Sequence, residues 1–120
     1  MKKIKKSKTY IEGFDKLIEG GFNYGSSVLI SGTPGTGKTI FSLEYLYNGA
    51  SKESEVGIYF SFKEKRKSLV EQAKQFNFDI EKFEKKQLLK LISIGSNDIS
   101  ENTVRDIIEI IESTKAKRVL

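Results

Sequence analysis

A chain of 120 residues is expected to form one domain or part of one, and its 38% hydrophobic and 31% charged residues are typical of a globular protein. It has no cysteine and no histidine, which excludes disulfides, thiolate or imidazole metal sites and a Ser-His-Asp triad, so any general base must be a carboxylate, lysine or tyrosine. No apolar run is long enough to span a membrane or to form a secretory signal, so we expect a cytoplasmic protein.

The net charge of +5 arises in a basic N-terminal tail, residues 1–9. The tail carries five lysines, and the rest of the chain holds 16 basic and 16 acidic residues. A nucleic-acid-binding core is expected to carry its basic face in the folded part. We therefore predict a solvated arm, with a weak electrostatic contact to nucleic acid or to a protein partner as the alternative.

The first elements after the tail are a short helix and a strand. In "EGFDKLIEGG", apolar residues at helical spacing followed by two glycines predict an amphipathic helix: Phe14, Leu17 and Ile18, then Gly20 and Gly21. The aliphatic run "SSVLIS", residues 26–31, predicts a buried strand.

Helices and strands alternate through the rest of the chain. The predicted order is a helix over 38–50 that stops at Asn48-Gly49, a strand over 55–62, a helix bearing Leu69, Ala73 and Phe76 on one stripe, a strand over 87–94, a helix over 101–112, and the start of a last strand in "AKRVL". This alternation predicts an α/β fold with a mainly parallel sheet and flanking helices.

The stretch "SGTPGTGKTI", residues 31–40, fits the phosphate-binding motif G-x-x-x-x-G-K-[ST] and lies between a predicted strand and a predicted helix. Glycines let successive backbone amides turn inward around phosphate oxygens, and the start of the following helix adds its positive dipole end. We expect the nucleotide contacts to come from Gly32, Thr33, Pro34, Gly35, Thr36, Gly37, Lys38 and Thr39.

Two residues of this loop have distinct chemical roles. Lys38 is expected to reach the β- and γ-phosphates and so to act in catalysis, and the Thr39 hydroxyl is expected to bind Mg²⁺. The alternative is a glycine-rich turn in which the lysine has no such role.

A candidate general base follows the strand over 55–62. The carboxyl ends of parallel strands line the ligand crevice, so Glu64 would lie beside the phosphate loop, where it could orient or deprotonate water. The alternative is that Glu64 is one charge in the solvated run "KEKRK".

The segment "IEGFDKLIEGGFNYGSSVLISGTPGTGKTIFSLEYLYNGA" resembles the opening of a KaiC-type ATPase domain of the RecA-like P-loop superfamily. The likeness continues through "VGIYFSFKEK", "LVEQAKQFNFDIEKFEKKQLLKLISI" and "AKRVL", and covers residues 10–120. It implies a RecA-like fold with a Walker A loop, ATP with Mg²⁺, and a homo-oligomer, often a ring-shaped hexamer with nucleotide between subunits. It also implies a pair of acids after Phe62, of which Glu64 matches the second while Lys63 replaces the first.

In such ATPases "AKRVL" leads into a strand that ends in the Walker B aspartate, so the chain resembles the N-terminal half of one domain. The expected explanations are a truncated gene or fragment, a split protein with a separate C-terminal half, or a degenerate binder. Hydrolysis by the chain alone should be weak or absent, and an ATPase completed by a missing half is the active form expected. A RecA- or RadA-like DNA-binding recombinase module and a non-catalytic interaction module are the alternatives.

Overall fold

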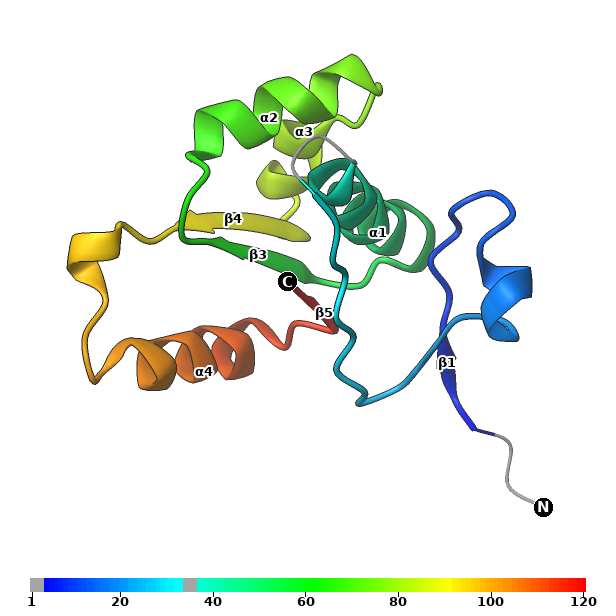
Figure 1. The fold of residues 1–120 in the computed structure, drawn as a ribbon, viewed down its shortest axis with the longest axis horizontal. Helices are drawn as coiled ribbons and strands as arrows, with labels where there is room; N and C mark the ends of the chain where they lie inside the picture. Colours follow the sequence, from blue (N-terminus) through cyan, green and yellow to red (C-terminus); the bar gives the residue numbers. More distant parts are fainter. Residues whose placement is uncertain (1–3, 34–36) are drawn as a thin grey trace.

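The computed structural model describes residues 4–33 and 37–120. Its main sheet has three parallel strands in the order β4-β3-β5, with β3 at Gly57–Ser61, β4 at Leu89–Ser93 and β5 at Arg118–Val119 (Figure 1). Gly57 pairs with Leu89 on one side and with Arg118 on the other. The predicted α/β fold with a parallel sheet is therefore confirmed.

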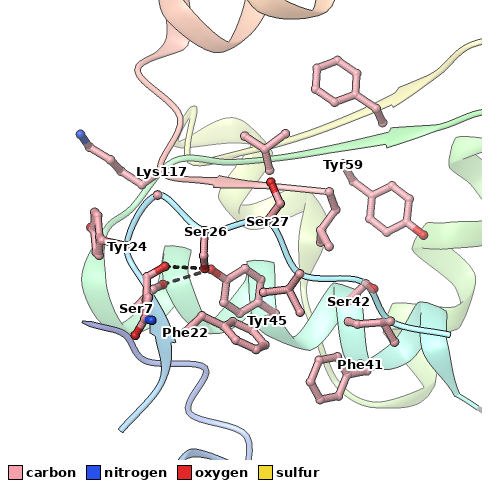
Figure 2. A pocket seen from close by; sticks show the side chains of 17 residues that line it. Ser7, Phe22, Tyr24, Ser26, Ser27, Phe41, Ser42, Tyr45, Tyr59 and Lys117 are labelled. Atoms are coloured by element: carbon pink, nitrogen blue, oxygen red, sulfur yellow. Dashed lines mark hydrogen bonds between the residues drawn. The ribbon is translucent and has the colours of Figure 1, made fainter. Parts of the chain in front are cut away.

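The predicted strand over 26–31 is wrong for this structure, because the segment forms no helix or strand (Figure 2). Among the described residues, none of the backbone groups of 27–31 makes a backbone hydrogen bond. Leu29 is 90% exposed and Val28 is 50% exposed. The aliphatic pattern is right for a buried strand, but a strand forms only when a neighbour pairs with it, and no described segment does so here.

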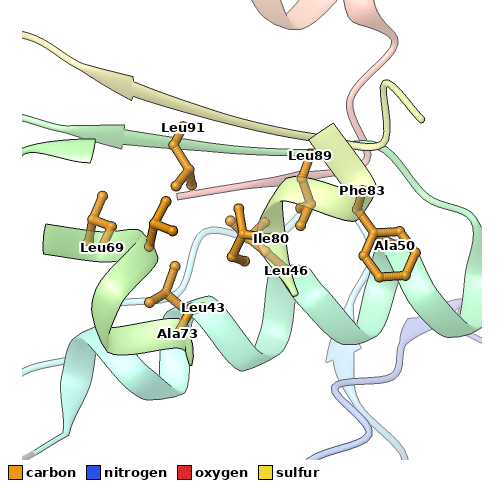
Figure 3. Close-up of a cluster of buried hydrophobic side chains, with 10 residues drawn as sticks. Leu43, Leu46, Ala50, Leu69, Ala73, Ile80, Phe83, Leu89 and Leu91 are labelled. Atoms are coloured by element: carbon orange, nitrogen blue, oxygen red, sulfur yellow. The ribbon is translucent and has the colours of Figure 1, made fainter. Parts of the chain in front are cut away.

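Three helices pack together over the sheet: α1 at Lys38–Glu53, α2 at Arg66–Gln75 and α3 at Ile80–Lys85. The core between them and the strands is aliphatic with one aromatic ring (Figure 3): Leu43, Leu46, Ala50, Leu69, Val70, Ala73, Ile80, Phe83, Leu89 and Leu91. Of the stripe predicted on the second helix, Leu69 and Ala73 are buried, whereas Phe76 caps the helix and is 51% exposed.

Helix α1 continues past the predicted stop at Asn48-Gly49 and ends at Glu53, where Ser54 takes the left-handed conformation with φ 52°. Asn48 and Gly49 are buried in its last turns. The Asn48 amide donates to the carbonyl of Thr9 at 3.0 Å. A Cβ on Gly49 would lie 2.4 Å from the Arg118 side chain. These two residues therefore pack against other parts of the fold. They do not form the helix-ending turn that an Asn-Gly pair predicts.

The N-terminal segment is a small unit beside α1. Strands β1 (Lys6–Ser7) and β2 (Phe22–Asn23) pair antiparallel, and between them the predicted amphipathic helix is a single 3₁₀ turn, η1, at Asp15–Ile18. Leu17 is 80% exposed, so the predicted apolar face is incomplete, and the C-cap is Glu19. Thr9 is fully buried, so the solvated arm expected over 1–9 does not extend through residues 6–9.

Helix α4 (Thr103–Thr114) follows the short 3₁₀ helix η2 (Ser96–Asp98) and lies apart from the other three helices (Figure 1). Its sequence is strongly amphipathic, yet it has no buried residue. Within the two described stretches, no helix is long and apolar enough to cross a membrane.

Asp15 holds the N-terminal unit together, and its loss should destabilise the fold. The carboxylate accepts hydrogen bonds from the Thr9 hydroxyl and from the amides of Thr9 and Tyr10. Burial alone would raise the pKa of Asp15, but these hydrogen bonds outweigh it and lower the pKa below its ordinary value. We expect Asp15→Asn to reduce the free energy of unfolding by about 1–3 kcal/mol at pH 7, measured by urea denaturation.

The pH dependence of the free energy of unfolding distinguishes the hydrogen-bonded role of the Asp15 carboxylate from a general effect of losing one negative charge. A lowered pKa gives stability that is present above the ordinary carboxyl pKa and is lost as the pH falls through the folded-state pKa. The difference between wild type and Asp15→Asn should therefore shrink below about pH 4. Asp106→Asn, on the exposed face of α4, is the matched control. A difference that persists unchanged at pH 2.5 would contradict this assignment.

Candidate functional site

The C-terminal end of the phosphate loop is the start of α1. Gly37 is the N-cap with φ 87°, a conformation that favours glycine, and apart from its chain neighbours no atom of the described residues lies within 4 Å of where its Cβ would be. No side chain of the described residues caps this helix, and its first turn has no acidic residue. Among the described residues, therefore, no side chain competes with an anion for the amides at the helix start. Pro34, Gly35 and Thr36 lie outside the described residues.

Lys38 and Gly32 mark the two ends of the loop and are in contact. The Lys38 ammonium donates a hydrogen bond to the carbonyl oxygen of Gly32. This contact draws the first residue of α1 toward the segment that enters the loop. A phosphate group placed there would meet the ammonium and the helix start together. Thr33 lies in the entering segment beside Gly32 and is exposed.

Thr39 and Glu64 meet although 25 residues separate them in the sequence. The Thr39 hydroxyl donates to one carboxylate oxygen of Glu64 at 2.8 Å, and the amide of Gln72 donates to the other at 2.7 Å. Gln72 lies on α2, so the carboxylate is held between two helices. The structure thus brings together two of the residues singled out in the sequence and adds Gln72, which no motif marks.

The main chain of Glu64 is fixed by the turn that follows β3. The Ser61 hydroxyl accepts from the Glu64 amide at 2.9 Å and donates to the Glu64 carbonyl at 2.7 Å. Ser93, at the end of β4, donates to the same carbonyl at 3.2 Å. Lys63 is exposed, as a residue of the solvated run would be, whereas Glu64 is half-buried. The carboxylate therefore has a defined position at the carboxyl ends of two parallel strands.

Tyr59 lies on the same side of β3 as Ser61, two residues away, and is part of this environment. Burial and the nearby charge of Glu64 raise the pKa of Tyr59 above its ordinary value of 10.0, although contact with the Thr39 hydroxyl works in the opposite direction. The phenol is therefore neutral at physiological pH and can act only as a neutral donor or acceptor. Side chains alternate between the two faces of a strand, so residues two apart, such as Tyr59 and Ser61, share a face. This alternation was the one sequence signal that could have linked Tyr59 to the site.

The chemistry of these residues fits a magnesium nucleotide. Mg²⁺ prefers oxygen ligands, and it usually takes one or two from the protein while water and phosphate oxygens supply the rest. The Thr39 hydroxyl keeps its lone pairs free when it donates its proton to Glu64, so it can still bind a cation. No cluster of three or more acidic residues that could hold a metal by itself occurs in 4–33 or 37–120. The ion would therefore depend on the nucleotide for most of its ligands.

A parallel sheet flanked by helices, with a glycine-rich phosphate-loop sequence directly before α1 and a carboxylate after β3, is the arrangement of an α/β P-loop nucleotide-binding domain. A family model described as "ATPase: KaiC" matches residues 7–120, and the chain belongs to the KaiC family of ATPases.

Curated proteins and a solved structure align with much of the chain. The circadian clock oscillator protein KaiC of Synechococcus elongatus is 44% identical over 66% of this chain, and a UPF0273 protein of Sulfurisphaera tokodaii is 45% identical over 69%. A KaiC from Parasynechococcus marenigrum is 36% identical over 97% of the chain. The crystal structure of a KaiC-like protein from Pyrococcus horikoshii superimposes with a TM-score of 0.88 and 35% identity over 98% of this chain.

These relatives are longer than the chain. It spans 15%, 29% and 24% of the three curated relatives, respectively, and 52% of the solved KaiC-like protein. The comparisons therefore confirm the resemblance to KaiC and the RecA-like fold for this stretch, and the activity of a whole relative does not transfer to it directly.

Proposed function

We propose that this chain binds ATP with Mg²⁺ and that Glu64 orients or deprotonates the water that attacks the γ-phosphate. The observation that carries the proposal is the hydrogen bond between Thr39 and Glu64, which sets the hydroxyl expected to hold the metal beside the carboxylate expected to act as base. Family membership supports the nucleotide, because the family is one of ATPases.

The residues have separate tasks in this proposal. The loop over 32–39 and the start of α1 hold the triphosphate, and Lys38 neutralises its charge. The magnesium ion would stabilise negative charge that develops on the phosphates. Ser61 and Ser93 hold the main chain of Glu64, and Gln72 holds its carboxylate.

The functional form that we propose is a homo-oligomer, as the resemblance to ring-forming ATPases implies. We place it in the cytoplasm because the sequence has no cysteine and no secretory signal pattern. The phosphate loop, Lys38 and Thr39, which would bind the nucleotide, all lie within this chain.

ATP should stabilise the fold in a way that depends on Lys38. At about 100 times its Kd, ATP-Mg²⁺ is expected to raise the free energy of unfolding by about 2.7 kcal/mol, measured by denaturant titration with and without nucleotide. Lys38→Ala should remove this increase, because the ammonium no longer neutralises the phosphates. Lys90→Ala, an exposed lysine on β4, should retain it.

Two results would contradict the proposal. An unfolding curve of the wild type that ATP leaves unchanged would favour a non-catalytic interaction module. Equal stabilisation of the wild type and Lys38→Ala would mean that ATP binds elsewhere. A salt-dependent shift of DNA mobility, with no ATP effect, would instead support the DNA-binding module.

A further inference from the structure

The two oxygens of the Glu64 carboxylate have separate donors that come from different helices. Thr39, in the first turn of α1, donates to Oε1 at 2.8 Å, and Gln72, on α2, donates to Oε2 at 2.7 Å. Both the position and the direction of the carboxylate are therefore defined. The two donors differ in function, because Thr39 is the predicted ligand of Mg²⁺ and Gln72 has no predicted contact with the nucleotide.

The Gln72 amide is itself oriented by a second contact within α2. Its nitrogen also donates to the Ser68 hydroxyl at 3.2 Å, one helical turn earlier on the same face. An amide nitrogen carries two protons, so each of them has its own acceptor here. The reverse orientation would point the amide oxygen at the Glu64 carboxylate, where neither group can donate. The direction of the Gln72 donor is therefore set before any nucleotide binds.

Glu64 lies in a run of cations that would attract an unrestrained carboxylate. Exposed lysines flank it in the sequence: Lys63, Lys65 and Lys67. The fourth cation of the run, Arg66, is paired with Glu84 on α3. Among the described residues, none of the ion pairs includes Glu64. Its carboxylate therefore turns away from the cations beside it and toward two neutral donors, of which Gln72 is the one outside the phosphate loop.

We propose that Gln72 is a positioning residue, which holds Oε2 so that Oε1 stays beside Thr39 at the start of α1. The inference rests on the proposed role of Glu64 as the base. In that reaction Oε1 takes a proton from the attacking water, the water oxygen bonds to the γ-phosphorus, and the bond from phosphorus to the ADP oxygen breaks. Gln72 takes no part in these bond changes and keeps its hydrogen bond to Oε2.

Gln72→Met tests this role, because methionine has similar length and helix propensity but no donor. We expect ATP turnover to fall by about 10- to 100-fold, as is typical when an outer hydrogen-bond partner of a functional group is removed, with ATP affinity unchanged. Affinity is measured from nucleotide-dependent stabilisation, which also shows that the variant is folded. Gln75→Met, at an exposed glutamine of the same helix, is the matched control and should match the wild type.

A double variant separates positioning from a general structural effect. Gln72→Met should lower turnover in the wild-type background but have no further effect in Glu64→Gln, because no base remains to be positioned. A structural defect would lower turnover by the same factor in both backgrounds. That result would overturn the inference.

Hydrogen exchange of side-chain amides measures the contact in the protein without nucleotide. Both Nε2 protons of Gln72 have acceptors, so they should exchange at least about tenfold more slowly than those of Gln75. The Gln75 side chain is exposed and makes no hydrogen bond with any described residue. Glu64→Ala should remove most of the protection of Gln72. Equal exchange of the two glutamines in the wild type would contradict the inference.

The outcomes distinguish this inference from the proposed function. A Glu64→Gln variant as active as the wild type would refute the base and the positioning role together. A wild type that ATP stabilises without any turnover would do the same. Full activity of Gln72→Met, with Glu64→Gln impaired, would overturn the positioning role alone and leave the proposed base in place.

Discussion

Replacing Arg118 with methionine should lower the free energy of unfolding by about 3–5 kcal/mol, as removal of one partner of a buried ion pair typically does. The guanidinium is 1% exposed. It pairs with Glu55 at 3.2 Å and donates to the carbonyls of Tyr45 at 3.0 Å and of Lys8. Methionine would fill part of the volume but would remove the guanidinium donor from all three acceptors and the countercharge from Glu55, so the loss should be large against a total of about 5–15 kcal/mol.

The size of this effect follows from what Arg118 connects. It belongs to β5 at the C-terminal end of the chain, while Lys8 belongs to the N-terminal unit and Tyr45 to the middle of α1. The guanidinium also lies 4.4 Å from the centre of the Tyr45 ring, which adds a cation–π contact. One side chain therefore holds both ends of the chain against the same helix.

Urea denaturation followed by circular dichroism measures the change, with Arg105→Met on the exposed surface of α4 as the matched control. Glu55→Gln should also destabilise the fold, because it leaves the buried guanidinium without its countercharge. A loss below about 1 kcal/mol for Arg118→Met, the range of surface ion pairs, would contradict the assigned role.

The arginine also explains a glycine in the middle of a helix. Glycine in a helix interior costs about 1 kcal/mol relative to alanine, and Asn-Gly normally marks a helix end. At Gly49 any side chain would collide with Arg118 Cδ and Nε at 2.4 Å. The sequence showed Asn48-Gly49 and the charged run "KAKRVL" as unrelated features, and only the tertiary contact between them accounts for both.

Most of the fold followed from local patterns in the sequence. The two pentapeptide strands that pair in parallel, β3 and β4, lie within the predicted ranges 55–62 and 87–94. Helix α4 lies within two residues of its predicted bounds. These elements have continuous aliphatic runs or a clear helical period, so the local pattern of the sequence predicts them. The segment over 26–31 shows the limit of this reasoning, because its pattern describes a strand whose pairing depends on residues elsewhere.

The candidate site was predictable in part for a similar reason. The loop motif and the position after a strand identify Lys38, Thr39 and Glu64 from the sequence. Their proximity was predicted from a parallel sheet, and in the structure Thr39 in the first turn of α1 contacts Glu64 in the turn after β3. Gln72 was not predictable, because its role depends on the angle at which α2 crosses the site and no spacing rule encodes that angle.

Replacing Glu64 with glutamine should reduce ATP turnover by about 10²–10⁴-fold, the range that general acid–base catalysis contributes, while ATP binds as before. The glutamine side chain is nearly the same size as that of glutamate, and its amide oxygen can still accept a hydrogen bond from Thr39. The amide cannot, however, take a proton from the attacking water. In addition, its NH₂ group would face the Gln72 donor, so the position of the side chain should loosen as well.

Single-turnover hydrolysis of radiolabelled ATP, with protein in excess over ATP, detects slow reactions and measures the turnover of each variant. ATP affinity is measured in parallel from nucleotide-dependent stabilisation. Glu71→Gln, an exposed glutamate on α2, controls for loss of charge near the site and should hydrolyse like the wild type. Turnover of Glu64→Gln equal to that of Glu71→Gln would exclude Glu64 as the base. A parallel loss of ATP affinity and turnover would assign it to nucleotide binding, since a base that acts only on water contributes to the transition state and not to the bound ground state.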